Sequence, residues 1–500
     1  MKKRYVVSLD EGTTSARAVL IDAQGKVAGS AQRVFPQHYP HPGWVEHSPR
    51  DILSAQLGAL TELLVSRGLG SDNLDSLGIT NQRETTVVWN RETGDPVCNA
   101  IVWQCRRTAP LIDSICGDPD VARAVTAKTG LVPDAYFSAS KIRWILDNVP
   151  GARRDAEAGK LAFGTVDSWL IWTLTGGAVH ATDVTNASRT LLFDIHDMRW
   201  DPWLCDLFDV PMNMLPEVRP SSGVFGTTAA SAGVVGGVPI CGAAGDQQSA
   251  LFGQRCFEAG QAKNTYGTGC FLLMHTGSAA STSHHGLLTT VAASAPQVAH
   301  PEYALEGSVF MGGALMQWLR DELGLVADLR EAERLARSVA STEGVFVVPA
   351  FTGLGAPYWD ADARGAILGL TRGTTRAHIV RAALESLAYQ VYDLVEAMQA
   401  DAGMPLSVLN VDGGASANDF LMQFQSDVLR TPLRRPGNIE TTALGAAYLA
   451  GLTTGFWDST DALLDLRAGD AVYTPDMEDE RHAALLDGWR RAVARTFSTL

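Results

Sequence analysis

A polar turn follows the first apolar run of this chain. Residues 5–9 read YVVSL and predict a buried strand, and residues 10–17 read DEGTTSAR. Such a turn offers backbone N–H groups and hydroxyls at one end of a sheet, where phosphate oxygens can bind. Because a carboxylate repels a bare phosphate, Asp10 indicates a divalent cation between the two. Arg17 could contact the same oxygens, although an ordinary hairpin turn is the alternative.

Two further polar groups follow predicted strands. Residues 77–80 predict a short buried strand, and Arg83 and Glu84 lie just after it. An adjacent guanidinium and carboxylate are nearly neutral as a pair, so they can be buried together and bind hydroxyl groups. The alternative is a surface ion pair. Asp246 and Gln247 follow a glycine, and there the alternative is the start of a helix, where aspartate is favoured.

The elements around these groups alternate between strands and helices. Residues 17–22 and 26–35 predict a hairpin that continues from the first strand. Ser48 and Pro49 match the N-cap and first position of a helix that continues to about Ser66. The first half of the chain is therefore predicted to be an α/β domain.

The second half repeats this plan. Its predicted segments are two strands (262–266 and 270–274) around the turn Gly267-Thr268-Gly269, two helices (311–323 and 376–402), and a strand (408–411) that leads into a glycine-rich turn and another helix. We therefore predict two related α/β domains, residues 1–253 and 254–500, with ligands in the cleft between them.

Composition narrows the class of protein. The chain has 500 residues, of which 46% are hydrophobic, and a net charge of −15. This charge argues against nucleic acid or an anionic membrane as a partner. There is no Walker loop, no G-x-G-x-x-G helix start and no apolar stretch of about 18 residues that could span a bilayer. Because the seven cysteines lack C-x-x-C spacing, we expect reduced thiols and a cytoplasmic protein without membrane insertion.

Longer runs point to a family. These runs are PGWVEH at 42–47, GITNQRETT at 78–86, IVWQCRRT at 101–108, AGDQQ at 244–248, KNTYGTG at 263–269 and PAFTGLGAPYW at 349–359. With these runs in this order, the chain resembles the FGGY carbohydrate kinases of the actin-like ATPase superfamily, and within them the members that phosphorylate glycerol. The resemblance extends over nearly the whole chain.

The resemblance implies two duplicated domains of ribonuclease H-like topology that close over ATP and substrate. The N-terminal domain would bind glycerol and phosphate, and the C-terminal domain would bind the adenine nucleotide. The implied reaction is in-line phosphorylation of glycerol by ATP at one terminal hydroxyl. It gives sn-glycerol 3-phosphate and ADP, and it feeds glycerol catabolism and glycerolipid synthesis. A homodimer or homotetramer is also expected.

The family pattern assigns a set of acceptor-binding residues. Glycerol has three hydroxyls and little apolar surface, so its recognition requires several directed hydrogen bonds. The matching positions are Arg83, Glu84, Tyr136, Asp246 and Gln247, with Trp103 and Phe271 as apolar walls. For Tyr136 and Trp103 the alternative is an ordinary core aromatic. We expect Asp246 to be the general base that takes the proton of the attacking hydroxyl.

The resemblance also assigns nucleotide contacts. The phosphate-binding positions are Thr13, Thr14, Ser15 and Arg17, with Thr268 from the second domain, and the positions around the adenosine are Gly313, Gln317, Gly414 and Asn418. Asp10 would be catalytic and hold Mg²⁺ through water. Turns from both domains would then converge on one triphosphate, so that domain closure becomes part of catalysis.

Several positions depart from the family pattern, Glu11 among them, and two rival functions stay open. Glu11 stands where the family usually has glutamine, and we expect its carboxylate to point away from the phosphates or to touch the water shell of the metal. Another FGGY kinase, for a pentulose, gluconate or erythritol, would keep the nucleotide turns but change Arg83, Glu84 and Tyr136. An actin-like or Hsp70-like interaction protein would share those turns without needing the three acceptor residues.

Overall fold

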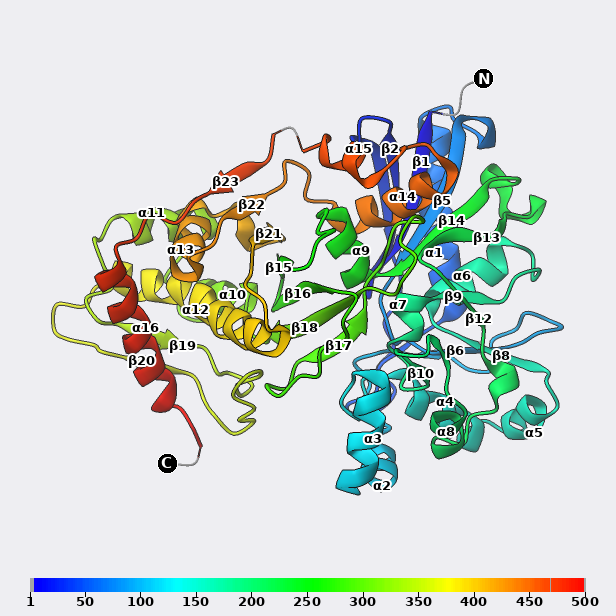
Figure 1. Cartoon of the computed structure of the whole chain (residues 1–500), viewed down its shortest axis with the longest axis horizontal. Coiled ribbons are helices and arrows are strands. Elements are labelled where there is room, and N and C mark those ends of the chain that lie inside the picture. The colour runs from blue at the N-terminus through cyan, green and yellow to red at the C-terminus, as the bar shows by residue number, and fades with distance from the viewer. Residues whose placement is uncertain (1–3, 468, 499–500) are drawn as a thin grey trace.

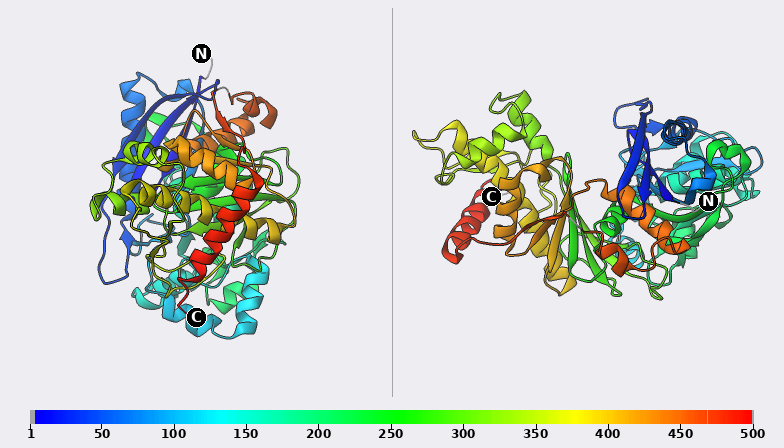
Figure 2. Two further views of the ribbon diagram at one scale, coloured as in Figure 1. Left: turned by 90° about the vertical axis from the view of Figure 1, so that its left-hand side faces the viewer. Right: turned by 90° about the horizontal axis from the view of Figure 1, so that it is seen from above.

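Two mixed β-sheets lie in two lobes that sit side by side (Figure 1). The structure, a computed structural model, describes residues 4–467 and 469–498. The first sheet has the strand order β13-β14-β5-β1-β2-β3, and the second has the order β17-β18-β16-β15-β21-β22-β23. Figure 2 shows the lobes from above, with the blue start of the chain in one lobe and the yellow helix and red C-terminal helix in the other.

The strands have the following bounds. The first sheet contains β1 Tyr5–Glu11, β2 Ser15–Asp22, β3 Val27–Val34, β5 Leu74–Asn81, β13 Ser222–Thr227 and β14 Pro239–Gly245. The second contains β15 Gln261–Tyr266, β16 Cys270–Gly277, β17 Leu288–Val291, β18 Tyr303–Val309, β21 Val408–Asp412, β22 Leu433–Arg435 and β23 Ala471–Tyr473. Short two-stranded pairs are formed by β4 Glu46–His47 with β7 Ala100–Ile101, β6 Val87–Asn90 with β8 Leu161–Gly164, β9 Ala181–Asp183 with β12 Glu217–Arg219, β10 Phe193–Asp194 with β11 Arg199–Trp200, and β19 Phe346–Val348 with β20 Ala366–Leu368.

The helices have the following bounds. Those of the first half are α1 Pro49–Ser66, α2 Ala109–Cys116, α3 Pro119–Thr129, α4 Ser138–Asn148, α5 Ala152–Glu157, α6 Val166–Leu174, α7 Val184–Ala187, α8 Pro202–Leu207 and α9 Asp246–Gly253. Those of the second half are α10 Gly313–Asp321, α11 Leu329–Arg337, α12 Arg376–Ala402, α13 Asp419–Leu429, α14 Thr441–Thr454, α15 Thr460–Leu464 and α16 Asp479–Ala494. Within the described residues, no helix combines the length and the apolar composition needed to cross a bilayer.

The two sheets share one pairing plan. In the first, β3, β2 and β1 are antiparallel neighbours, and β1, β5 and β14 are parallel neighbours. In the second, β18, β16 and β15 are antiparallel, and β15, β21 and β22 are parallel. The prediction of a duplicated α/β plan is therefore confirmed.

Two long helices begin and end where the sequence predicts. The side chain of Ser48 accepts a hydrogen bond from the backbone N–H of Asp51 at 3.2 Å and caps α1. In the second half of the chain, α12 ends at Ala402 and is followed by Gly403, which adopts a φ of 64° in the left-handed region. Glycine adopts this conformation without strain, which explains why the helix stops there.

Helix α14 packs against the first sheet although it comes late in the chain, and Figure 1 shows it beside β1 and β5. Two glycines permit its close contact with α9. A Cβ at Gly445 would lie 1.8 Å from the backbone oxygen of Ser249, and a Cβ at Gly253 would lie 1.9 Å from that of Thr441. This packing brings Glu440, which precedes α14, to the turn between β1 and β2.

A helical region adjoins the first sheet at the lower right of Figure 1. It contains α2 to α5 and α8 and has its own apolar core, which includes Phe137, Ile142 and Phe163. Tyr136 packs against this core, and Trp103 contacts Tyr136, so this region positions two of the predicted acceptor residues.

Candidate active site

Three parallel strands of the first sheet end at one edge and place the predicted acceptor residues there. Thr80 of β5 is paired with both Asp10 of β1 and Ala244 of β14. Residues that follow the carboxyl ends of such strands lie close together. Arg83 follows β5 and Asp246 follows β14, so the fold brings both of them to the end of β1.

Arg83 and Glu84 are buried, with relative exposures of 3% and 1%. Nε of Arg83 lies 3.2 Å from Oδ1 of Asp246 and 3.8 Å from Oε1 of Glu84. The alternative of a surface ion pair is therefore wrong. Glu84 also has a φ of 61°, a left-handed backbone conformation that is strained for a side chain of this kind and is concentrated at functional sites.

Asp246 is the first residue of α9, and its Oδ1 accepts a hydrogen bond from the backbone N–H of Gln247 at 2.8 Å. The alternative interpretation, that Asp246 and Gln247 begin a helix, is therefore also correct. The side chain of Asp246 is 33% exposed. A small molecule can therefore reach a carboxylate that already contacts Arg83.

Trp103 and Tyr136 lie beside these charges. Their ring centroids are 5.4 Å apart in an edge-to-face arrangement, both residues are half-buried, and Tyr136 also packs against the core of the helical region. Burial raises the pKa of Tyr136, and Glu84 raises it further. Nε1 of Trp103 donates a hydrogen bond to Oγ1 of Thr13 at 3.0 Å. The aromatic pair therefore contacts the turn between β1 and β2.

The second sheet presents a row of side chains on one face. Lys263 of β15 is paired with Leu273 of β16, and Leu273 is paired with Glu306 of β18. Directly paired residues point to the same face of a sheet. Phe271 lies two residues from Leu273 on the same strand and therefore on the same face, and it is half-buried.

Glu306 contacts the first lobe. Its two carboxylate oxygens accept hydrogen bonds from NH1 and NH2 of Arg83 at 2.6 and 2.8 Å. Arg189, which is fully buried, donates from Nε to Oε1 of Glu84 at 2.7 Å. Burial raises the pKa of Glu84, and the nearby Arg189 and Arg83 partly oppose this effect.

Lys263 also contacts the first lobe. Its Nζ donates hydrogen bonds to Oε1 of Gln247 at 2.5 Å and to Oγ1 of Thr265 at 3.1 Å. Burial lowers the pKa of Lys263, while the carboxylates of Asp412 and Asp246 raise it. A buried ammonium group therefore lies next to the helix start that carries Asp246.

The sequence predictions missed Arg189, Glu306 and Lys263. Two of them carried a signal, because Lys263 and Glu306 are the lone charged residues of the strands QAKNTY and YALEGSV. A charge that must be buried in a sheet requires a partner. Arg189 follows the short helix α7 and carries no comparable signal.

The segment between β1 and β2, residues 12–14, is named the first turn. The two strands form a hairpin, so the alternative interpretation of this segment is also correct. NH2 of Arg17 donates to Oδ2 of Asp10 at 2.8 Å, and NH1 of Arg17 lies 2.5 Å from Oε2 of Glu440. Burial raises the pKa of Asp10, and Arg17 partly offsets this rise.

The hydroxyl residues at the first turn differ in exposure. Thr14 is exposed, whereas Thr13 and Ser15 are half-buried. Oγ of Ser15 accepts a hydrogen bond from Nε2 of Gln32 at 2.7 Å. Thr13 and Ser15 therefore already have partners, and Thr14 is accessible to solvent.

Glu11 is fully buried, and neither of its carboxylate oxygens has a hydrogen-bond partner among the described residues. Burial raises its pKa well above the ordinary value, and the charge of Asp10 adds to the rise. Successive side chains of a strand point to opposite faces. Glu11 therefore points away from the face that carries Asp10, in agreement with one of the two expectations for it.

A cavity of about 260 Å³ lies in the second lobe. Its lining includes Gly267, Thr268, Gly313, Gln317 and Gly414. The backbone N–H of Gly313 donates to the oxygen of Gly267 at 2.8 Å, which joins the turn after β15 to the start of α10. At Gly414 an added Cβ would meet no atom within 4 Å, so the backbone there borders open space.

Asn418 does not line this cavity. It is 2% exposed, and its Oδ1 accepts a hydrogen bond from the backbone N–H of Leu421 at 3.0 Å, which caps α13. The other nucleotide positions predicted for the second domain do line the cavity.

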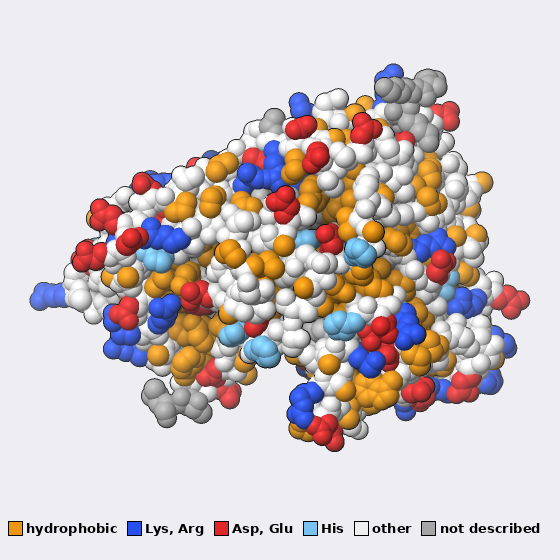
Figure 3. All heavy atoms as spheres, viewed as in Figure 1, with side chains coloured by type: hydrophobic (Ala, Val, Ile, Leu, Met, Phe, Trp, Pro, Cys, Tyr) orange, Lys and Arg blue, Asp and Glu red, His pale blue; other side chains and the backbone are white. Residues whose placement is uncertain are grey.

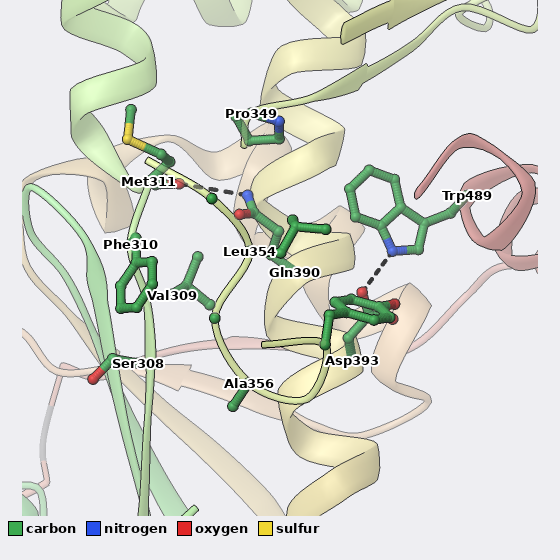
Figure 4. Close-up of a pocket in the computed structure, with 13 residues that line it drawn as sticks. Ser308, Val309, Phe310, Met311, Pro349, Leu354, Ala356, Gln390, Asp393 and Trp489 are labelled. Atoms are coloured by element: carbon green, nitrogen blue, oxygen red, sulfur yellow. Dashed lines mark hydrogen bonds between the residues drawn. The ribbon is translucent and has the colours of Figure 1, made fainter. Parts of the chain in front are cut away.

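A second cavity, of only about 20 Å³, lies among residues 308–311 at the end of β18, the segment 349–358, α12 and Trp489 of α16 (Figure 4). Asp393 projects into it from α12, and its Oδ2 accepts a hydrogen bond from Nε1 of Trp489 at 2.7 Å. Gln390 donates to the backbone oxygen of Met311 at 3.4 Å. A space of this size holds about one water molecule, so it is not a substrate site.

The carboxylates near the first turn fit a hydrated Mg²⁺. This ion is usually bound by one or two carboxylates together with water and substrate phosphates. Asp10 and Asp246 are close enough that the charge of Asp246 raises the pKa of Asp10. Among the described residues, no group of three or more His, Cys, Asp or Glu side chains could hold a metal by itself. A metal at this point would therefore need ligands from the substrate and from water.

The charged side chains on one face of the molecule are mixed in sign. On the face shown in Figure 3, acidic and basic side chains are interspersed, and no large basic area is present. The full sequence carries a net charge of −15, which is unfavourable for attracting a polyanion.

Comparisons with known proteins agree with this geometry. Residues 5–253 match the N-terminal domain of the FGGY family of carbohydrate kinases, and residues 262–454 match its C-terminal domain. The chain is 57% identical over 496 residues to a glycerol kinase of Shewanella frigidimarina, an alignment that covers 99% of this chain and 98% of the relative. It is 56% identical over 503 residues to a glycerol kinase of Vibrio vulnificus, covering 100% and 99% of the two chains.

Solved structures of kinases share the fold of this chain. The fold matches that of a Plasmodium falciparum glycerol kinase with ADP at a TM-score of 0.94 and 39% identity, over 99% of both chains. It matches a ligand-bound xylulose kinase of Lactobacillus acidophilus at a TM-score of 0.85 and 21% identity, again over 99% of both chains, and this second match concerns the fold alone. The duplicated sheets, the turn after the first strand of each sheet (residues 12–14 and 267–269) and these matches together show that the chain belongs to the FGGY family of carbohydrate kinases.

Proposed function

We propose that this protein phosphorylates glycerol with ATP, giving sn-glycerol 3-phosphate and ADP. The observation that carries the proposal is the contact between buried Arg83 and partly exposed Asp246, 3.2 Å apart at the strand ends next to Asp10. This arrangement offers donors and acceptors for a small polyol beside a turn suited to phosphate. The full-length relatives named glycerol kinase support the same acceptor.

Glycerol is bound by directed hydrogen bonds in this proposal. Its hydroxyls donate to Glu84 and Asp246 and accept from Nε of Arg83 and from the phenol of Tyr136. Gln247 adds a side-chain amide, and Trp103 and Phe271 pack against the carbon chain. Each hydroxyl that is missing from an acceptor would leave a buried polar group unpaired, which is the source of selectivity.

Asp246 is the general base. It accepts the proton of the attacking hydroxyl while the new oxygen–phosphorus bond forms and the bond between the β–γ bridging oxygen and the γ-phosphorus breaks. The γ-phosphoryl group moves to glycerol, and ADP leaves with the bridging oxygen. Arg83 keeps the carboxylate of Asp246 in place for this step.

The nucleotide bridges the two lobes. Thr13, Thr14, Ser15 and Arg17 bind the β- and γ-phosphates from the first lobe, and Thr268 binds them from the second. The adenosine occupies the cavity of about 260 Å³ lined by Gly313, Gln317 and Gly414, with Asn418 at the nearby start of α13. In this proposal residues 1–253 bind most of glycerol and the phosphates, residues 254–500 bind the adenine nucleotide, and Thr268 and Phe271 of the second lobe add contacts to the phosphates and to glycerol.

Asp10 would hold Mg²⁺ through water, and the ion would supply positive charge that offsets the charge of the phosphates. NH2 of Arg17 donates to Asp10 at 2.8 Å, so the guanidinium lies beside the carboxylate that would hold the ion. The protein works in the cytoplasm as a homodimer or homotetramer in this proposal.

The reaction is tested by its product. Purified protein is incubated with ATP, Mg²⁺ and glycerol, and a dehydrogenase specific for sn-glycerol 3-phosphate reports the product. We expect product only when all three are present. Release of ADP without sn-glycerol 3-phosphate would contradict the proposal.

A further inference from the structure

A carboxylate from the second lobe holds Arg83. Glu306 of β18 accepts two parallel hydrogen bonds from the guanidinium, at 2.6 Å from NH1 and 2.8 Å from NH2. A two-pronged contact of this kind fixes the plane of the guanidinium as well as its position. Both side chains are 3% exposed, so water does not compete for these bonds.

Arg189 completes a buried ion group, which consists of Arg83, Glu84, Arg189 and Glu306. Arg189 donates to Glu84 at 2.7 Å, and its NH1 lies 3.3 Å from Oε2 of Glu306. The group thus contains two cations and two carboxylates. Burial raises the pKa of Glu306, but Arg189 and Arg83 together bring it to about 2. Glu306 is therefore charged throughout the neutral pH range.

This arrangement determines which edge of Arg83 is available. NH1 and NH2 are occupied by Glu306, so the Nε edge is the one that faces Asp246 at 3.2 Å. Without Glu306, the edge of Arg83 that carries NH1 and NH2 could turn toward Asp246. It would then hydrogen-bond to the carboxylate of Asp246, which must bind the acceptor. An uncompensated positive charge would also remain in the buried ion group.

We propose that Glu306 is a positioning residue for acceptor binding: it holds Arg83 with its Nε edge toward glycerol and Asp246, while Arg189 holds Glu84. The inference rests on the proposed function. It makes the acceptor site a shared product of the two lobes, because Glu306 belongs to the second sheet and Arg83 follows a strand of the first.

Steady-state kinetics of Glu306→Gln test this proposal. The expected result is a KM for glycerol raised by about tenfold or more, with the KM for ATP within about twofold of the original, because only the acceptor side loses its support. A purely structural role would instead lower the amount of active enzyme and change neither KM. A KM for glycerol within about twofold of the original, in folded protein, would overturn the proposal.

Glu385→Gln is the matched control. Glu385 is also 3% exposed and paired with an arginine, Arg381, at 2.7 Å, but it lies on α12 away from the site. It is expected to lower stability without changing the KM for glycerol. An equal rise in that KM in both variants would overturn the specific role of Glu306.

Glu306→Asp keeps the charge but shortens the side chain. It is expected to give a KM for glycerol between those of the original protein and Glu306→Gln. If Glu306→Gln does not fold, a raised KM for glycerol in Glu306→Asp supports the proposal and an unchanged KM overturns it. Failure of the proposed function is distinguishable, since the unsubstituted protein would then form no glycerol phosphate at all. Activity of that protein together with unchanged KM values in both Glu306 variants would overturn only this inference.

Discussion

Lys263 of β15 donates a hydrogen bond of 2.5 Å to Oε1 of Gln247, so a buried ammonium group from the second lobe orients a predicted acceptor residue of the first. Asp246 is adjacent to Gln247 and raises the pKa of Lys263. The second lobe therefore contributes to the proposed acceptor site as well as containing the nucleotide cavity.

Replacement of Lys263 should impair acceptor use. Lys263→Met removes the donor to Gln247 and the buried cation near Asp246, so kcat/KM for glycerol should fall by about tenfold or more. Lys128→Met is a suitable control, because Lys128 pairs with Asp201 at a partly exposed position in the helical region. Equal values of kcat/KM in both variants would contradict the role assigned to Lys263.

Asp246→Asn should separate binding from turnover. The amide can still contact a hydroxyl but cannot accept its proton, so kcat should fall by about 10² to 10⁴ while calorimetry still detects glycerol binding. Undiminished kcat in this variant would remove Asp246 as the general base.

Glu11→Gln should stabilise the protein more at high pH than at low pH. Burial raises the pKa of Glu11, so the folded protein holds a proton that the unfolded chain has already lost above the ordinary range of glutamate. Stability therefore falls as the pH rises through that interval, and the amide removes this loss. The measurement is Tm at pH 5 and pH 8, with exposed Glu62→Gln as the control. A gain in Tm for Glu11→Gln that is no larger at pH 8 than at pH 5 would contradict the assignment.

Gly414→Val should weaken nucleotide binding selectively. An added Cβ there meets no atom within 4 Å, so the fold accepts the side chain, which then projects toward the cavity. The KM for ATP should rise by about tenfold and the KM for glycerol should stay nearly constant. The reverse pattern would place the adenosine elsewhere.

The strand and helix pattern was largely predictable because its local signals are strong. Ser48 and Pro49 determine the start of α1, and Gly403 determines the end of α12. The packing of α14 against the first sheet was not predictable, because it depends on close contacts at Gly253 and Gly445 between segments far apart in the sequence.

The site was predictable where a motif places residues next to one another, as for Arg83 and Glu84. The buried partners of these two residues were not predictable, because Glu306 and Arg189 come from segments far away in the sequence. Exposure could not be predicted from the sequence either. Asn418 matched a family position, yet in the structure its side chain caps α13.

The identity of the acceptor is the central claim, and a coupled assay of ADP release tests it most directly. Purified protein is given ATP and Mg²⁺ with glycerol, dihydroxyacetone, erythritol or xylulose, and kcat/KM is compared. We predict that glycerol gives the highest value, because Arg83, Glu84, Tyr136 and Asp246 match its hydroxyls. Turnover of xylulose or erythritol without turnover of glycerol would contradict this claim.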